Sequence, residues 1–515
     1  MDEFMQKHAP DVNGSLSGFD RLVFRGTLRS LAVKSGMLDY LSRAGVLLKD
    51  FGSFVEQKSQ QLKQSSLAEA QRLGRPVQYL RSPKLSKEEL ARNIAGADGI
   101  TAGLICVLTV VEVCMSYEIF RDRQAKKLSL EPRTRKCLFL YHYWIDPLFG
   151  FISARIQTWF PFNIQVCLNG REWLARQMDR AGLRYERRDN CFPWMEDGAA
   201  AQRLMDEQLR TPWPSVLRAI ARRLNPAHEA MFAPYQTDYY WTVHQSEWAS
   251  DILFKSAAKL GAVYDKLTRN AIAVFGSDDV MRFLGRKLNG HFQGEVVSNY
   301  RRRPEGVRIK HCVKGNAIKA YDKQGSILRV ETTINQPREF KVYRPKEGEP
   351  HGSLSWRPMR RGIADLHRRT EVSQAANSRY LQALAALSTD RRLREVVAPM
   401  CRPVRWRGKR VRALRPWSEP DRLLLEAISR GEFAIHGFRN RDLRQALHPG
   451  RCLPHVQRRL SSQTSYRLRL LRAHGLIRKA PRTKRYLLTK KGREMTTAIL
   501  HVQHIPISKL TALAA

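Results

Sequence analysis

The sequence predicts a multidomain α+β protein with two mixed α/β domains, a connector and a smaller C-terminal module. Three observations lead to this prediction. The chain has 515 residues, more than a single hydrophobic core usually serves. Blocks with apolar residues at helical spacing are followed by blocks rich in strand formers. The composition then changes to a basic connector and a short, mostly helical module. We therefore place the domains at 1–232, 233–345, 346–417 and 418–505.

The net charge is the strongest indication of function. Ninety Lys and Arg residues against 48 Asp and Glu residues give a formal net charge of +42. Such an excess of positive charge repels itself in a folded chain unless a polyanion neutralises it. Nucleic acid, either DNA or RNA, is therefore the expected partner.

Cysteine usage and hydropathy indicate a cytoplasmic protein with no membrane partner. The eight cysteines include no C-x-x-C pair, which argues against a zinc ribbon and against a disulfide framework. The most apolar stretch, 99–117, carries Glu112 and is rich in strand formers, so we expect no membrane span. The N-terminus lacks the basic start and apolar run of a secretory signal.

In the first domain, a helical region precedes a set of strands. Residues 18–31 are predicted to form a loop, a short strand and a turn at Gly26. Residues 36–95 should form two or three helices, because their apolar residues recur at helical spacing. After the strands, Asn169 is the expected N-cap of a helix that ends at Gly182.

Two runs, "IQTWFPFNIQ" in the first domain and "YYWTVHQSEW" at the start of the second, interleave aromatic with amide side chains. Surfaces that stack unpaired bases have this composition. The competing interpretation is that the rings belong to the core, as strand aromatics more often do.

The connector ends in the basic stretch "CRPVRWRGKRVRALR", which holds seven Lys and Arg among 15 residues and no acid. We expect this stretch not to fold by itself and to lie along a phosphate backbone. A solvated linker is the alternative. The cations predicted to bind nucleic acid here are Arg405, Arg407, Lys409 and Arg410.

The second domain closes with "IKAYDKQGSILRVET", a hairpin that alternates polar and apolar residues on both sides of Gly325. A three-residue loop with left-handed Gly325 would pair Lys319 with Arg329 and Tyr321 with Ile327. A two-residue loop would mix charged residues with core residues, so we favour the longer loop. The buried face then holds Ile318, Ala320, Leu328 and Val330, and the other face holds Lys319, Tyr321, Arg329 and Glu331.

Three interpretations of this second face remain open. In the first, Lys319, Lys323 and Arg329 grip a sugar-phosphate backbone. In the second, Tyr321 is a nucleophile on a phosphodiester or Glu331 is a metal ligand. In the third, the face belongs to an ordinary strand pair. The string "YDK…LRVE" resembles a short stretch of the rolling-circle replication initiators of plasmids and filamentous phages, which nick DNA through a tyrosine; their His-apolar-His metal motif does not occur here.

The C-terminal module contains three helical runs, "PDRLLLEAISRG", "FRNRDLRQAL" and "SSQTSYRLRLLRAHG", followed by two strand-like runs around a basic tip. This order resembles the winged helix-turn-helix family. The resemblance implies that the N-terminal part of the third helix touches base edges, and the residues there are Gln463, Thr464, Ser465 and Arg467. It also implies phosphate or minor-groove contacts from Arg469, Arg472, Arg482, Lys484 and Arg485.

Two carboxylates on or beside apolar strands, Asp20 and Glu112, are candidate ligands for Mg²⁺ or Mn²⁺. An unpaired carboxylate is costly in such a place, and metal-dependent nucleases bring carboxylates together around their ions. The alternative is that each pairs with a basic side chain. No G-x-x-x-x-G-K-[ST] loop occurs, so no nucleotide cofactor is expected.

Together these features favour a cytoplasmic nucleic-acid-binding protein similar to proteins of mobile elements. It would process DNA by nicking, replication or recombination, with metal-dependent or tyrosine-based nuclease chemistry and a winged-helix reader. Two alternatives are a non-catalytic protein partner of a structured RNA and a winged-helix transcriptional regulator.

Overall fold

The computed structural model describes residues 1–275, 277–285, 296–303, 306–349, 351–387, 393–430, 433, 437–450, 453–480 and 483–502. They form a mixed α/β structure with a large mixed sheet. None of the helices within these ranges combines the length and the hydropathy that a bilayer span requires. Two compact units are described separately below: the N-unit, residues 18–247 with 361–366, and the C-unit, residues 1–17, 248–360 and 367 onward. This division falls within two long strands, whereas the boundaries predicted from sequence follow residues 232, 345 and 417.

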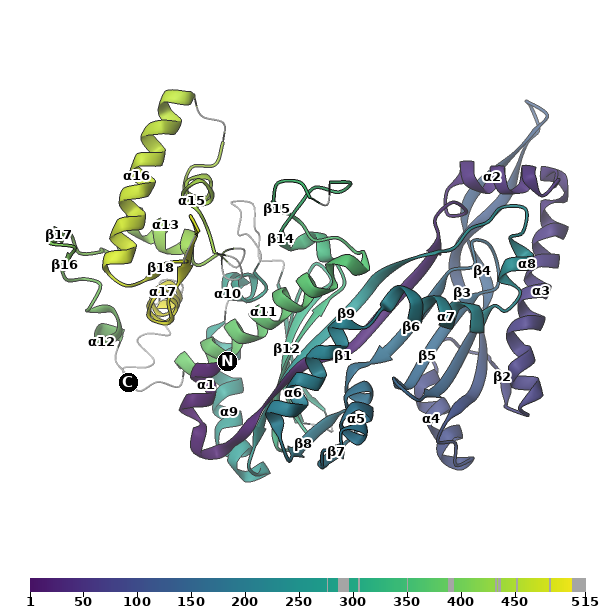
Figure 1. The fold of residues 1–515 in the computed structure, drawn as a ribbon, viewed down its shortest axis with the longest axis horizontal. Helices are drawn as coiled ribbons and strands as arrows, with labels where there is room; N and C mark the ends of the chain where they lie inside the picture. Colours follow the sequence, from purple (N-terminus) through teal and green to yellow (C-terminus); the bar gives the residue numbers. More distant parts are fainter. Residues whose placement is uncertain are drawn as a thin grey trace. The chain divides into compact units, whose positions relative to one another are not determined.

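The sheet of the N-unit has the strand order β9-β1-β6-β5-β4-β3-β2 (Figure 1). The ladder from β1 to β3 is antiparallel, and β2 pairs with β3 in parallel. The strands are β1 (Val12–Leu28), β2 (Val77–Leu80), β3 (Gly103–Asp122), β4 (Lys127–Asp146), β5 (Gly150–Gln157), β6 (Ile164–Asn169) and β9 (Tyr239–Phe254), and a separate hairpin is formed by β7 (Tyr185–Arg188) and β8 (Cys191–Met195).

The helices of the N-unit include three in the region where two or three were expected and the one expected after Asn169. They are α2 (Lys34–Arg43), α3 (Phe51–Arg72), α4 (Lys87–Ala97), α5 (Gly170–Arg180), α6 (Gly198–Glu207), α7 (Trp213–Leu224) and α8 (His228–Met231). Asn169 caps α5, because its side chain accepts hydrogen bonds from the backbone N–H groups of Arg171 and Glu172. Gly182 follows α5 with a φ of 66°. Both predictions for this helix are confirmed.

Two strand predictions for the N-unit are wrong. Residues 18–31 do not form a loop, a short strand and a turn, because β1 runs without interruption through Gly26. A Cβ atom at Gly26 would lie 2.8 Å from the ring of Trp241, so this glycine allows a close approach and does not mark a turn. The sequence also favours four separate strands, "GLICVLTVVEVC", "SYEIFR", "KKLSLEP" and "KCLFLYHYWID", where the structure has only β3 and β4. β3 and β4 pair along their whole lengths. Burial in a hydrophobic core does not account for the polar part of this ladder.

The sheet of the C-unit has the order β10-β11-β12-β13-β9-β1, to which β9 and β1 contribute their residues in this unit. The other strands are β10 (Val297–Arg303), β11 (Gly306–Val313), β12 (Asn316–Lys323) and β13 (Ile327–Ile334). The helices of this part are α1 (Asp2–Lys7), α9 (Ala257–Val274), α10 (Ser277–Phe283) and α11 (Leu366–Leu387).

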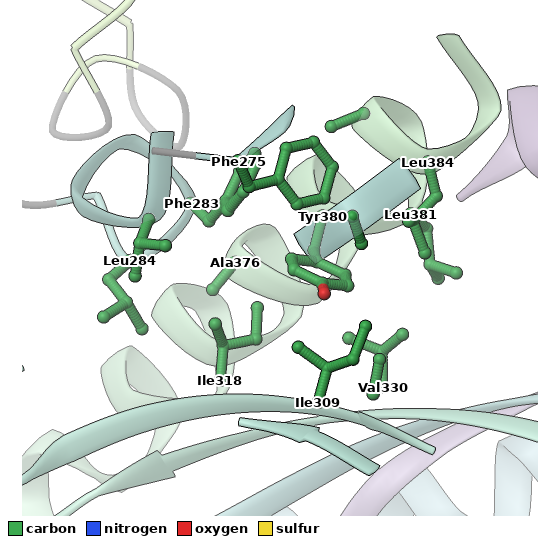
Figure 2. Close-up of a cluster of buried hydrophobic side chains, with 14 of the residues drawn as sticks. Phe275, Phe283, Leu284, Ile309, Ile318, Val330, Ala376, Tyr380, Leu381 and Leu384 are labelled. Atoms are coloured by element: carbon green, nitrogen blue, oxygen red, sulfur yellow. The ribbon is translucent and has the colours of Figure 1, made fainter. Parts of the chain in front are cut away.

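Figure 2 shows how strands and helices of the C-unit share one hydrophobic core. Ile309, Ile318 and Val330 point from the strands toward the ring of Tyr380 on α11. Phe275 and Phe283 pack on the same ring, with centroids 5.4 and 5.2 Å from it. This packing buries one face of the β12–β13 hairpin.

The hairpin confirms the predicted faces and corrects the predicted pairs. Its loop has three residues, and Gly325 is left-handed with a φ of 82°. Ile318, Ala320, Leu328 and Val330 all belong to the core. However, Lys319 lies opposite Glu331 and Tyr321 opposite Arg329, two residues away from the predicted register. A shift of two residues keeps every side chain on its face, so alternation could not distinguish the two registers.

The remainder of the C-unit carries a second hydrophobic core. Its elements are β14 (Lys341–Arg344), β15 (Ser355–Pro358), α12 (Leu393–Val397), β16 (Val404–Trp406), β17 (Lys409–Val411), α13 (Glu419–Ile428), α15 (Asn440–Leu447), α16 (Pro454–Ala473), β18 (Ile477–Lys479), β19 (Tyr486–Leu488) and α17 (Lys490–Val502). The basic stretch is not unfolded by its charge, since β16 and β17 form a hairpin with Arg407 and Gly408 at its turn. Val404, Trp406 and Val411 pack against this core and anchor the hairpin.

Candidate functional site

Glu331 is the centre of a polar cluster on the β12–β13 hairpin. Its Oε1 accepts a hydrogen bond from Lys319 Nζ at 2.6 Å, and its Oε2 accepts one from the Tyr321 hydroxyl at 2.9 Å. Burial is the largest single influence on the Glu331 carboxyl and acts to raise its pKa, but Lys319, the charge of Arg329 and the Tyr321 hydrogen bond together outweigh it, so the pKa lies below its usual value. The cluster therefore places a phenol beside an ionised carboxylate that can accept its proton.

The other two cations predicted to bind here are buried. Arg329 is fully buried and forms a bidentate ion pair with Asp251 of β9, with N–O distances of 2.6 and 2.9 Å. Lys323 is 9% exposed. The charge of Arg329 thus balances a buried carboxylate inside the C-unit and is not available to the phosphate backbone of a nucleic acid.

Trp406 joins two arginines that the sequence assigns to nucleic-acid binding. Arg407 lies over the Trp406 ring with Cζ 4.9 Å from its centroid, and Arg472 of α16 lies 5.1 Å from the same centroid. The hairpin also presents exposed Arg405, Lys409 and Arg410. Tertiary packing therefore brings the basic connector and the third helix of the C-terminal module together.

A groove with a volume of about 1030 Å³ lies between the β14–β15 hairpin and the C-terminal helices. We call it the arginine groove, after Arg439, Arg441, Arg444 and Arg485, which line it beside Tyr343 and Trp356. Arg485 stacks on Tyr343 with Cζ 3.9 Å from the ring centroid. The sequence predicts that Arg485 binds nucleic acid, but it does not predict this for the three arginines of "FRNRDLRQAL". The pattern of that run indicates a helix and does not indicate which surface the helix lines.

The positive charge of the arginine groove is poorly compensated by its own walls. Asp442 is the one acidic residue among the described lining residues, and it accepts a hydrogen bond from the Arg439 backbone N–H and lies 3.5 Å from Arg441. Within the described structure, Arg439 Nε and His448 Nε2 are buried without a hydrogen-bond partner. The groove therefore combines net positive charge with unused hydrogen-bonding capacity and two aromatic side chains.

The predicted base-reading positions do not lie near a helix N-terminus. α16 begins at Pro454, so Gln463, Thr464, Ser465 and Arg467 lie in its middle; their predicted position is wrong, and their contact with base edges stays a prediction. Thr464 is 1% exposed and donates to the Leu460 carbonyl, while Ser465 accepts from Asn440. Gln463 and Arg467 line a smaller cavity, Arg469 and Lys484 are exposed, and Arg482 lies outside the described residues.

The two candidate metal ligands lie in different parts of the N-unit sheet. Glu112 on β3 is held by Arg155 at 2.7 Å, by the Tyr141 hydroxyl at 2.8 Å and by Lys87 at 3.4 Å. Asp20 on β1 is 7% exposed and accepts a hydrogen bond from Asn190. A carboxylate oxygen of Asp20 lies within 4.8 Å of one of Glu247, a neighbour on β9 that no sequence signal suggested. Glu112 is thus engaged by basic and phenolic partners, while Asp20 has an acidic neighbour.

Comparison with known proteins adds no relative, since no family model, no curated protein and no solved structure matches this chain.

Proposed function

We propose that this chain is a cytoplasmic nucleic-acid-binding protein of mobile-element type, in which the C-terminal module is a winged helix-turn-helix that grips a DNA duplex. The single observation that carries the proposal is the arginine groove. Its four arginines face one acid, and guanidinium groups match phosphate oxygens in geometry and charge.

The exposed cations around Trp406 extend this basic surface. Arg405, Lys409 and Arg410 reach solvent beside the Trp406 ring, on which Arg407 and Arg472 stack. Stacked arginines lose less conformational freedom on binding than freely rotating ones. The groove and the hairpin together supply the contacts that position a phosphate backbone.

The salt dependence of duplex binding tests this proposal. A variant with Arg441→Gln, Arg444→Gln and Arg485→Gln removes three cations from the groove. The matched control carries Arg43→Gln, Arg133→Gln and Arg184→Gln, whose side chains are all more than half exposed in the N-unit. Affinity for a labelled duplex is measured by fluorescence anisotropy over a range of salt concentrations.

We expect the groove variant to lower the slope of log affinity against log salt by about one for each phosphate that the protein no longer neutralises. The control should leave the slope within the error of the wild type. Equal slopes for both variants would remove the groove from the proposal. Stronger binding to structured RNA than to any duplex would favour the RNA partner, and sequence-specific duplex binding by a dimer would favour the regulator.

A second candidate function, DNA nicking, is favoured by the contact between Tyr321 and Glu331. The Tyr321 hydroxyl would attack a phosphodiester and pass its proton to Glu331, the phosphotyrosine bond would form as the P–O3′ bond breaks, and the leaving 3′ oxygen would take up the proton from Glu331. Lys319 lies close enough to offset developing negative charge. Mg²⁺ or Mn²⁺ would serve as the metal cofactor of this reaction.

Labelled single strands and duplexes incubated with the protein and either ion test this second function. The expected product is a covalent adduct in the wild type that disappears in Tyr321→Phe while DNA affinity is retained. Absence of cleavage under every condition would end the nicking proposal and leave the binding proposal in place.

A further inference from the structure

Four side chains form a continuous row across one face of the N-unit sheet. Tyr141 lies opposite Arg155, Arg155 opposite Gln165, and Gln165 opposite Arg25, on the four strands β4, β5, β6 and β1. Directly paired residues share a face of a sheet, so this row presents two guanidinium groups, an amide and a phenol in one line.

A cavity of about 280 Å³ opens beside this row. Its lining includes Arg25, Phe139, Arg155, Gln157, Asn163 and His244. The volume is just below the usual range for small-ligand sites, so the cavity is large enough for at most one nucleotide and too small for a base pair.

Two arginines, Arg25 and Arg155, line this cavity. Arg155 is oriented by Glu112 at 2.7 Å and by Gln165 at 2.8 Å. Among the described residues no ion pair joins Arg25 to an acid. Burial, together with the positive charges of Arg155 and Arg361, lowers the pKa of Arg25. Because neighbouring cations repel each other here, a bound anion relieves the repulsion.

An unused acceptor lies in the same cavity. Asn163 Oδ1 is buried and has no hydrogen-bond partner in the described structure. The Asn163 amide is held by Gln157, which in turn donates to the carbonyl of Phe160 at 3.0 Å. Leaving a buried acceptor unpaired is costly, so a ligand with an N–H donor would be favoured at this position.

We propose that this cavity binds one unpaired nucleotide of a nucleic-acid strand. Arg25 and Arg155 hold its phosphate, Phe139 provides an apolar wall for its base, and Asn163 Oδ1 accepts a hydrogen bond from a base N–H. The site goes beyond the duplex-binding function proposed above, because it lies in the N-unit and requires a strand that is not base-paired.

Anisotropy with a short fluorescein-labelled oligothymidine tests the proposal, because thymine carries the required N–H donor. The comparison strands are an abasic oligonucleotide of equal length and a duplex, and thymidine monophosphate serves as a free competitor. The variants are Arg25→Gln and Asn163→Leu. Arg133→Gln is the charge-matched control, since Arg133 is exposed on β4 and paired with Glu118 at 3.6 Å.

We expect Arg25→Gln to weaken oligothymidine binding about tenfold while duplex affinity stays within about twofold. Asn163→Leu should reduce the preference for oligothymidine over the abasic strand. Equal losses in Arg25→Gln and Arg133→Gln would overturn the proposal. Competition by thymidine monophosphate as strong as that of the strand would also overturn it, because the ligand would then be a free nucleotide.

Photocrosslinking of wild-type protein to a strand containing 5-iodouracil provides a test that needs no variant. We expect the crosslink on the peptide that carries Phe139, Asn163 or His244. A crosslink confined to other peptides would contradict the proposal. An unchanged salt dependence of duplex binding in the groove variant would count against the function proposed above and not against this site, so the two failures are distinguishable.

Discussion

Arg329 and Asp251 form a buried bidentate ion pair that joins β13 to β9, with Arg329 Nε 2.6 Å from Asp251 Oδ1. Both side chains are at most 1% exposed. Removal of one partner leaves an uncompensated buried charge, which is more damaging than removal of both. The pair therefore stabilises the C-unit only while both members are present.

The first prediction is that Arg329→Met lowers the free energy of unfolding by about 3–5 kcal/mol. The double variant Arg329→Met with Asp251→Leu should recover part of this loss. Chemical denaturation followed by circular dichroism measures both. Arg133→Met, at an exposed ion pair, is the control and should change stability by less than about 1 kcal/mol. A double variant less stable than the single one would contradict the proposed role of the pair.

The second prediction concerns the stability of the N-unit below neutral pH. His142 lies between β4 and α3, with Nε2 3.1 Å from the Ser66 carbonyl oxygen. Burial lowers its pKa to about 4. An unfolded histidine binds its proton near pH 6.5, so between about pH 6.5 and 4 the unfolded state binds more protons. This group's contribution is present above pH 6.5 and falls by up to about 3 kcal/mol as the pH drops to 4.

Thermal midpoints measured from about pH 7.5 to about pH 4.5 check this prediction. The His142→Gln variant should show a flatter decline than the wild type, while His455→Gln, at an exposed position, should follow the wild type. Burial also lowers the pKa of His311 in the C-unit to about 4, so the decline should persist in part in His142→Gln. Identical curves for the wild type and His142→Gln would exclude the proposed role of His142.

The third prediction is that Cys114 and Cys137 form a disulfide when a peroxide is added. Their Sγ atoms lie 2.7 Å apart across β3 and β4. The hydrogen bond from Cys137, assisted by Arg135, lowers the pKa of Cys114 despite burial. The Cys114 thiolate attacks the peroxide and becomes a sulfenic acid, and the Cys137 thiol then displaces water to form the S–S bond.

Intact-mass measurement and peptide mapping in a Cys401→Ser background test the oxidation, since Cys401 is the exposed cysteine among those the structure describes. The expected product has lost two hydrogens and links the Cys114 and Cys137 peptides. Cys137→Ser should stop at the sulfenic acid. Full alkylation of both thiols after peroxide treatment would rule the disulfide out.

The fourth prediction is that Gly26→Val destabilises the N-unit by about 1–3 kcal/mol, because any side chain at Gly26 meets the Trp241 ring. Denaturation followed by tryptophan fluorescence measures the loss. Gly52→Val within α3 is the control, because no atom lies within 4 Å of a Cβ atom built at Gly52. Gly99 is also in open space, but its positive φ would strain any side chain. A smaller loss for Gly26→Val than for Gly52→Val would show that the Trp241 contact is easily relieved.

Local chemistry made several features predictable from the sequence. The Asn169 cap, the glycine after α5 and the left-handed Gly325 each depend on backbone geometry within a few residues. The two faces of the β12–β13 hairpin follow from alternation alone. The strand registers, the uninterrupted β1 and the start of α16 were not predictable, because each depends on partners that are distant in the sequence.

By itself, the sequence determined a basic, mixed α/β chain and the polar and apolar faces of its central hairpin, since charge and alternation are properties of composition and order. The tertiary structure decided which cations are accessible. It buried Arg329 against Asp251, stacked Arg485 on Tyr343, and aligned Arg25 with Arg155. The physical reason is that burial and cross-strand pairing join residues far apart in the chain, and no local pattern encodes which partner each guanidinium meets.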